Sequence, residues 1–282
     1  MITLKKLENG FEYIEVENQS AHAKIALQGA HIFHFARHHE RPILWLSQKS
    51  DFKKGVAIRG GVPICWPAFA KSNPDLPQHG FARTAMWTLG ECQEIDAHTT
   101  EITLILRHNQ ERLKLWHYKF ELCLSITISD QLTMALKTTN LDTRAMKLTQ
   151  ALHSYFDVGA ISDVRIKGLD QKPYHDSLKD QEKVQEGDLF ITKEVDVIYQ
   201  KVDKRIQLIT KDSILNIDNS GSSSLVVWNP WREKCKHTSG MSEGDYLQFV
   251  CIESANARED FRIIPPGGTH ILSATISKHR II

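Results

Sequence analysis

Short blocks of hydrophobic residues alternating with polar ones recur along the chain. Clusters of turn-forming residues separate them, such as Asn18, Gln19 and Ser20. The blocks are rich in Ile, Leu, Val, Thr and Phe, and their period of two is typical of β-strands. They run over residues 11–18, 24–36, 86–95, 101–108, 118–129 and 131–140. The pattern predicts antiparallel β-sheet.

The connections between these blocks are short. Blocks 118–129 and 131–140 are separated by a tight turn, and Lys211 and Asp212 join 205–210 to 213–218. Short turns make hairpins, and no long amphipathic helix intervenes that could cross between parallel strands. We therefore expect an all-β fold, a large antiparallel β-sandwich, with residues 1–282 forming a single domain.

Two stretches depart from the strand pattern. Residues 168–194 are crowded with charges and poor in apolar residues, which predicts a solvated excursion from the sheets. Residues 231–246 are irregular and could hold a short helix. Neither stretch has the Pro, Gly and Ser content of an interdomain linker.

The composition disfavours several classes of protein. The formal net charge is +1, so we expect no nucleic-acid partner and no polybasic membrane anchor. The five cysteines are odd in number and lack a CxxC pair, which argues against a disulfide framework and a thiolate zinc site. We find no signal-peptide core and no run of roughly 20 apolar residues that could cross a membrane. We expect a cytoplasmic protein that is a monomer or weak dimer.

The most distinctive stretch is 59–83, RGGVPICWPAFAKSNPDLPQHGFAR, which is too irregular for a long helix or an ordinary strand. Gly60 and Gly61 allow positive φ or a close approach of the main chain, and four prolines fix its direction. Arg59 and Arg83 are permanently charged, planar donors suited to a phosphate or carboxylate. The aromatic residues between them suit a sugar ring. The alternative is a surface loop whose arginines pair with nearby acids.

Two strand-like runs each carry one ionisable residue on a face with small or apolar neighbours. His153 shares its face with Ala151 and Tyr155, and Glu253 shares its face with Cys251. An imidazole there could donate a proton to a ligand, and a buried carboxylate needs a partner or a chemical role. The alternatives are a hydrogen-bonded structural histidine and a salt bridge to an arginine.

A group of histidines near the N-terminus invites a metal hypothesis that its spacing does not support. The segment HIFHFARHH has no HExxH motif, no nearby cysteine pair, and no acid at ligand spacing except Glu40. The glycine motifs of dinucleotide, Walker and nucleophile-elbow sites are absent as well. We therefore expect no metal and no cofactor. The histidines concerned are His31, His34, His38 and His39.

Several motifs, in order along the chain, carry a resemblance to a known family. RGGVPICWP followed by QHGFAR resembles the glucose-6-phosphate 1-epimerase branch of the aldose 1-epimerase superfamily. The likeness continues in ALHSYFDV, DVIYQ, VVWNPW and FVCIESAN, so it covers most of the chain. It implies a galactose-mutarotase-like β-sandwich. It also implies an isomerase that interconverts the α and β anomers of a hexose 6-phosphate, with a small phosphosugar as its partner.

The resemblance implies catalytic roles for two residues. His153 matches the general acid at the ring oxygen, and Glu253 matches the general base at the anomeric hydroxyl. Near pH 7 this chemistry needs Glu253 ionised and His153 at least partly protonated. We therefore expect each residue to favour the charged state of the other.

The resemblance also implies a substrate-binding set. Arg59 and Arg83 match residues that hold the phosphate, Gln78 matches a further substrate ligand, and its neighbour His79 could contact a sugar hydroxyl. Asp196 matches a hydroxyl ligand, although the next residue is more often basic in the family than the valine found here. From pattern alone, an acid before a short strand is usually a cap. Further candidates are Lys71 as a third positive charge, and Trp66 and Trp228 as stacking surfaces or core residues.

Two other functions remain open from the sequence. The first is an aldose 1-epimerase of unphosphorylated sugars, in which Arg59 and Arg83 would serve structure. The second is a sugar-phosphate binding protein without catalysis. A binder of that kind needs neither His153 nor Glu253.

Overall fold

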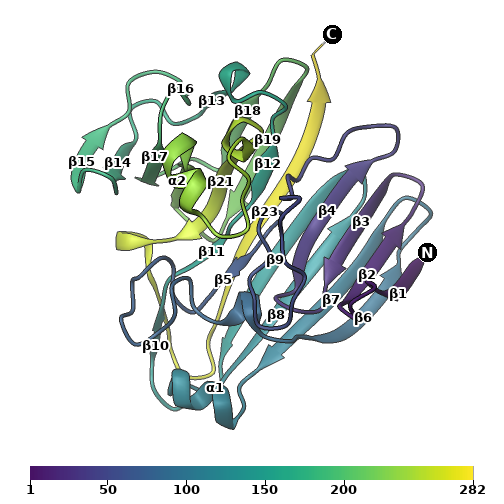
Figure 1. The fold of residues 1–282 in the computed structure, drawn as a ribbon. Coiled ribbons are helices and arrows are strands. Elements are labelled where there is room, and N and C mark those ends of the chain that lie inside the picture. Colours follow the sequence, from purple (N-terminus) through teal and green to yellow (C-terminus); the bar gives the residue numbers. More distant parts are fainter. Residues whose placement is uncertain (282) are drawn as a thin grey trace.

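The computed structural model describes residues 1–281, and paired antiparallel strands dominate it (Figure 1). One layer of the molecule is a nine-stranded sheet. In spatial order its strands are β16 (Leu189–Phe190), β13 (Arg165–Lys167), β18 (Arg205–Ile209), β19 (Ser213–Ser220), β23 (Thr269–Arg280), β9 (Gln131–Asn140), β8 (Phe120–Ile128), β7 (Thr100–Arg107) and β6 (Thr88–Glu94).

Two further sheets pack against the nine-stranded sheet. The first holds β1 (Ile2–Lys6), β2 (Glu12–Glu17), β3 (Ala21–Ala26) and β4 (His31–Arg37). The second holds β15 (Gln181–Val184), β14 (Pro173–Asp176), β17 (Val195–Gln200), β20 (Ser224–Asn229), β21 (Phe249–Asn256), β11 (Gln150–Leu152) and β5 (Ile64–Cys65), with β12 (Tyr155–Asp157) also paired to β21. A small pair joins β10 (Met146–Leu148) to β22 (Arg262–Ile264).

One large apolar core joins the three main sheets. Ile25, Leu124 and Ile252 come from different sheets and are buried in the same cluster. Along β8 and β9 the inward positions are buried and the outward ones are partly or fully exposed, as the alternating pattern predicts. The all-β antiparallel sandwich expected from the sequence is confirmed. No helix within residues 1–281 is long and apolar enough to cross a membrane.

Two local predictions need correction. Block 24–36 is two strands, β3 and β4, joined by a tight turn in which Gly29 and Ala30 have φ of +77° and +47°. The turn is itself largely buried and, apart from Gln28, lacks the polar residues that mark a surface turn, so the pattern hides it. The second correction is a short helix that the pattern did not reveal, α1 (Gln110–Leu115), between β7 and β8. Asn109 caps it by accepting a hydrogen bond from the Arg112 amide.

The charged stretch 168–194 is less irregular than predicted. It contains β15 and β16, the edge strands of two sheets, and β14, which lies between β15 and β17. Edge strands are partly solvated and carry charge well, so a polar composition did not exclude them. The second irregular stretch does hold a helix, α2 (Trp231–His237), as expected.

Asn229 closes the segment that carries α2. Its side-chain amide donates to the carbonyls of Tyr246 and Phe249, at 2.9 and 2.8 Å. Its side-chain oxygen accepts from the amide of Trp231 at 2.9 Å. One fully buried side chain therefore holds both ends of the excursion between β20 and β21.

Candidate active site

A cavity of about 360 Å³ opens on the face of the eight-stranded sheet that points away from the main core. Its walls come from that sheet, the 59–83 loop and the α2 segment. The structure brings all the predicted site residues together around it: Arg59, Gln78, His79, Arg83, His153, Asp196 and Glu253.

The floor of the cavity is formed by strands in register. Glu253 on β21 pairs with Val226 on β20, and Val226 pairs with Ile198 on β17. Alternation along these strands sends Val250 and Ile252 into the main core and Glu253 to the opposite face. His153 lies between β11 and β12, two short strands that both pair with β21.

His153 and Glu253 form a close, buried pair. The Nε2 atom of His153 lies 3.3 Å from Oε1 of Glu253, and the two side chains are 9% and 1% exposed. Within the described part of the chain, His153 Nδ1 and Glu253 Oε2 are buried without a hydrogen-bond partner. Buried polar atoms are rarely left unpaired, so these two have capacity for a ligand. Among residues 1–281 the ion pair of Glu253 is with His153, and no salt bridge to an arginine is formed there.

The protonation of this pair differs from the expectation. Burial raises the pKa of Glu253 well above its usual range, and the nearby Asp196 adds to the rise. Burial lowers the pKa of His153 well below its usual range, with His79, Arg83 and Arg59 adding to the fall. At this depth burial disfavours the charged form of each residue, in contrast to the expectation that each favours the charged state of the other. The reason is depth, because desolvation outweighs the attraction between the two groups.

The 59–83 loop packs closely against the sheets and contributes a side chain to the core. Gly61 has φ of +62°, and a Cβ there would lie 2.3 Å from the Ile32 carbonyl oxygen, so this close approach requires glycine. Trp66 is fully buried, and its indole donates to the Thr138 hydroxyl on β9 at 3.2 Å. Trp66 is therefore a core residue. His31 donates to the Gly60 carbonyl at 2.8 Å, which is a structural role.

Arg59 and Arg83 are held by neutral partners. Arg59 donates to the Tyr155 hydroxyl at 3.3 Å and to the Ser239 carbonyl at 3.2 Å. Arg83 donates to the Gln78 carbonyl at 2.8 Å. Within residues 1–281 neither arginine pairs with a carboxylate, in contrast to the structural alternative. Two guanidinium charges in one cavity are thus left for an anion.

His79 is neutral and oriented by its own loop. Its Nδ1 atom accepts a hydrogen bond from the Ala70 amide at 3.3 Å. Burial lowers the pKa of His79 to about 3, with Arg83 and Arg59 contributing. Since Nδ1 accepts, the proton of the neutral ring is on Nε2, which makes this atom a donor. Gln78 is exposed beside it.

The sequence did not single out Lys234 of α2, which also lines the cavity. Its Nζ atom lies 3.6 Å from Oδ2 of Asp196 and 3.2 Å from Oε1 of Glu194. Lys71, suggested as a third charge, does not line the cavity. The only signal for Lys234 was its position just after the VVWNPW motif, in a stretch without strand or helix periodicity.

Trp228, which was suggested as a stacking surface or a core residue, is half-buried and lines the cavity. Val197, the residue after Asp196, belongs to the core.

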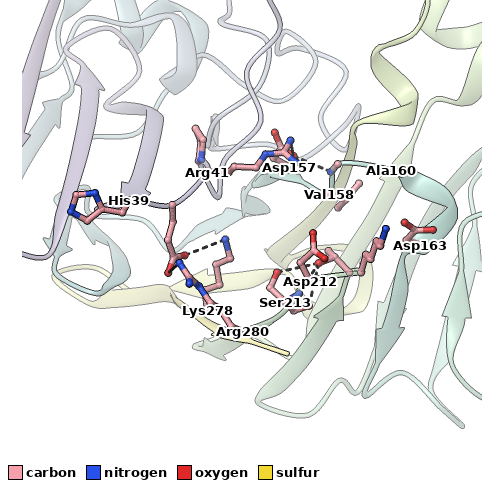
Figure 2. A pocket seen from close by; sticks show the side chains of 15 residues that line it. His39, Arg41, Asp157, Val158, Ala160, Asp163, Asp212, Ser213, Lys278 and Arg280 are labelled. Carbon is pink, nitrogen blue, oxygen red and sulfur yellow. Dashed lines mark hydrogen bonds and ion pairs between the residues drawn. The ribbon is translucent and has the colours of Figure 1, made fainter. Parts of the chain in front are cut away.

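A second hollow, of about 550 Å³, lies near the C-terminal end of β23 (Figure 2). Its charges are largely neutralised in pairs: Arg41 lies 3.4 Å from Asp157, and Lys278 lies 3.2 Å from Glu40. The larger hollow is therefore less suited to an anionic ligand than the cavity with two unpaired arginines. Within residues 1–281 no cluster of three or more His, Cys, Asp or Glu side chains could hold a metal.

Comparison with known proteins gives one consistent result. The Aldose 1-epimerase family model matches residues 12–277. A protein of Cenchrus ciliaris named "Putative glucose-6-phosphate 1-epimerase" is 33% identical over 93% of this chain and 83% of its own length. A protein of the same name from Escherichia coli K12 is 31% identical over 96% of this chain and 92% of its own length.

Solved structures agree with the sequence relatives. YeaD from Salmonella typhimurium, described as a "putative mutarotase", superposes with a TM-score of 0.93 at 28% identity, covering 99% of this chain and 94% of its own. A galactose mutarotase-like protein from Clostridium acetobutylicum shares the fold at 14% identity, with a TM-score of 0.74 over 100% of this chain and 99% of its own. With the family model and these relatives spanning nearly its whole length, the chain belongs to the aldose 1-epimerase family and is a sugar epimerase.

Proposed function

We propose that this epimerase interconverts the α and β anomers of a hexose 6-phosphate, with glucose 6-phosphate as the expected substrate. The observation that carries the proposal is the combination in one cavity of a buried acid–base pair with two arginines that have no carboxylate partner. The names of the relatives from Cenchrus ciliaris and Escherichia coli support it. No group beyond the chain's own side chains is needed for the proton transfers.

The proposed reaction needs one base and one acid. Glu253 takes the proton from the anomeric hydroxyl, His153 gives a proton to the ring oxygen, and the bond between the anomeric carbon and the ring oxygen breaks to give the aldehyde. Rotation about the bond to the next carbon presents the other face of the carbonyl. The ring then closes with both proton transfers reversed, so the enzyme returns to its starting state.

The resting pair already carries the single proton that this cycle needs. A protonated Glu253 beside a neutral His153 holds the same number of protons as an ionised Glu253 beside a protonated His153. Moving one proton between the two groups, whose atoms are 3.3 Å apart, produces the reactive form. The proposal therefore requires that substrate binding favour this transfer.

The phosphate of the substrate supplies a reason for the transfer. Arg83 and Arg59 both contribute to the low pKa of His153. A phosphate dianion bound to these two arginines offsets their charge, which makes a protonated His153 less unfavourable. In this proposal the phosphate promotes catalysis as well as binding. An unphosphorylated sugar should therefore have a lower kcat and a higher KM.

The test is anomer exchange at equilibrium, followed by NMR, for glucose 6-phosphate, glucose, and glucose with added inorganic phosphate. We expect the highest kcat for glucose 6-phosphate, a low rate for glucose, and partial recovery of the glucose rate with phosphate. Arg83→Ala and Arg59→Ala should raise KM for glucose 6-phosphate by about 10- to 100-fold, the effect of one charge-assisted contact. Lys71→Ala is the control, because this loop lysine does not line the cavity.

Each contrary outcome points to a specific alternative. Equal kcat/KM for glucose or galactose and for glucose 6-phosphate would favour an epimerase of unphosphorylated sugars. Binding of glucose 6-phosphate with an exchange rate equal to the uncatalysed one would favour a binding protein. The first result removes the proposed preference for a phosphosugar, and the second removes the proposed activity.

A further inference from the structure

A lysine from outside the sheet reaches the cavity beside a proposed sugar ligand. Lys234 is on α2, and its side chain is 43% exposed. Asp196 is the second residue of β17. Unlike Arg59 and Arg83, Lys234 is ion-paired with carboxylates of the protein within residues 1–281. Its charge is therefore partly offset by the protein itself.

Lys234 forms ion pairs with two carboxylates that repel each other. Glu194 immediately precedes β17 and Asp196 is its second residue, and both carboxylates lie near the same Lys234 ammonium group. Like charges at this spacing repel each other. The Nζ atom of Lys234 lies within 3.6 Å of both, which offsets that repulsion and restricts where the carboxylate of Asp196 can point. Without this lysine the two carboxylates would turn away from each other.

The segment that carries Lys234 also holds Arg59. The carbonyl of Ser239, just after α2, accepts a hydrogen bond from Arg59 Nε at 3.2 Å. The Thr238 hydroxyl donates to the Lys234 carbonyl at 2.7 Å, which ties this end of the segment to the helix. One short piece of chain therefore contacts both the arginine proposed for the phosphate and the aspartate proposed for a hydroxyl.

We propose that Lys234 is a positioning residue that fixes the carboxylate of Asp196 toward the sugar, and so contributes to selection of sugars with a hydroxyl at that place. The inference rests on the proposed role of Asp196 as a hydroxyl ligand. It assigns Lys234 no contact with the reacting atoms. Because the α2 segment holds Arg59 as well, it also sets the distance between the two ends of the substrate.

Lys234 also affects the catalytic pair through charge. The negative charge of Asp196 contributes to the raised pKa of Glu253. Lys234 beside Asp196 offsets part of that charge, so removing the lysine should raise the pKa of Glu253 further. A pH profile of kcat/KM therefore responds to Lys234 in a way that a helix-stabilising residue would not produce.

The experiment compares Lys234→Gln with Lys236→Gln in anomer exchange. Lys236 is on the same helix, pairs with Glu233 and Glu243, and does not line the cavity. We expect Lys234→Gln to raise KM about tenfold with kcat changed less than about threefold, and to move the acidic limb of the kcat/KM profile to higher pH. Lys234→Arg, which keeps the charge, should restore most of the loss, and Lys236→Gln should match the wild type.

A double-mutant cycle decides whether the effect runs through Asp196. In an Asp196→Asn background, Lys234→Gln should raise KM by less than about a further twofold, because the carboxylate that Lys234 positions is gone. Multiplying effects in the double variant would overturn the inference, as would KM and pH profiles for Lys234→Gln equal to those for Lys236→Gln.

The choice of substrate separates this inference from the proposed function. If the wild type exchanges galactose anomers and leaves glucose 6-phosphate unchanged, the phosphosugar proposal fails. The same variants are then measured on galactose, where the prediction for Lys234 is unchanged because it concerns a hydroxyl. If the wild type acts on glucose 6-phosphate and the cycle shows no coupling, the inference alone fails.

Discussion

The nine-stranded sheet buries one face and exposes much of the other, whereas β21 at the centre of the eight-stranded sheet is buried along its whole length. In β8 the buried positions are all apolar. In β21 they include Glu253, which is buried because the loop and α2 cover the second face of this sheet. Polar groups are costly to bury, so the doubly covered sheet is where stability has been given up for chemistry.

The sharpest way to test this contrast is to remove the buried acid. Glu253→Gln keeps the size of the side chain and removes the base, so kcat should fall by about 10²- to 10⁴-fold while the fold is retained. Anomer exchange by NMR measures the rate, and circular dichroism checks the fold. Glu121→Gln, the same change on the exposed side of β8, is the control and should leave the rate unaltered. A rate for Glu253→Gln near that of the control would contradict the contrast.

The opposite change removes apolar volume from the nine-stranded sheet. Leu124→Ala should lower the free energy of unfolding by about 2–5 kcal/mol, because Leu124 is fully buried in the shared core. The kcat of the folded fraction should remain within about twofold of wild type. Urea unfolding gives the first quantity. Lys137→Ala, at an exposed position of β9, should change stability by less than about 0.5 kcal/mol. A loss of kcat without a loss of stability would break the comparison.

The hydrogen bond from Trp66 in the loop to Thr138 in the nine-stranded sheet is one of several contacts between the two regions, and its removal should have a smaller effect. Thr138→Val takes away the acceptor for the Trp66 indole and leaves a buried N–H unpaired, at a cost of about 1–3 kcal/mol in unfolding free energy. Thr133→Val on the same strand is the control, since its hydroxyl is only partly buried. Equal midpoints of thermal unfolding for the two variants would show that the loop is not anchored through Trp66.

The last prediction concerns pH and the stability of Glu253→Gln. The raised pKa means that the folded state keeps the Glu253 proton over a pH range in which the unfolded state, with a pKa of about 4.3, has lost it. Stability of the wild type therefore falls as pH rises through that range, by at most about 1.4 kcal/mol per pH unit for one proton. Glu253→Gln lacks this loss, so its melting temperature relative to the wild type should rise as the pH increases above about 4.3. A difference in melting temperature between the two proteins that stays constant with pH would contradict this prediction.

The two regions also differ in how well the sequence foretells them. β9 begins and ends where the alternating pattern places it, because one face of this strand meets the core and the other meets solvent. The sequence pattern did not predict the buried turn at Gly29 or the six-residue helix α1, because both are too short to produce a periodic pattern of apolar residues. The predicted site residues all line one cavity, and the motifs that they share with the family led to them.

The electrostatics of the site could not be read in the same way. Sequence pattern placed His153 and Glu253 on suitable faces, but it does not give the depth at which a residue lies. Depth decides that desolvation dominates both pKa values. Lys234 was missed for a related reason: its role comes from the path of a loop across the sheet, and no local pattern encodes that path.

The double anchoring of the α2 segment by Asn229 has an evolutionary consequence. Because one amide fastens both the departure and the return of the chain, the residues between can vary in length and identity while the strands that carry the acid–base pair stay in place. Sugar preference can then diverge through this insert without rebuilding the machinery beneath it. Exchanging the segment between relatives, with Asn229 kept, would therefore test its share in sugar preference.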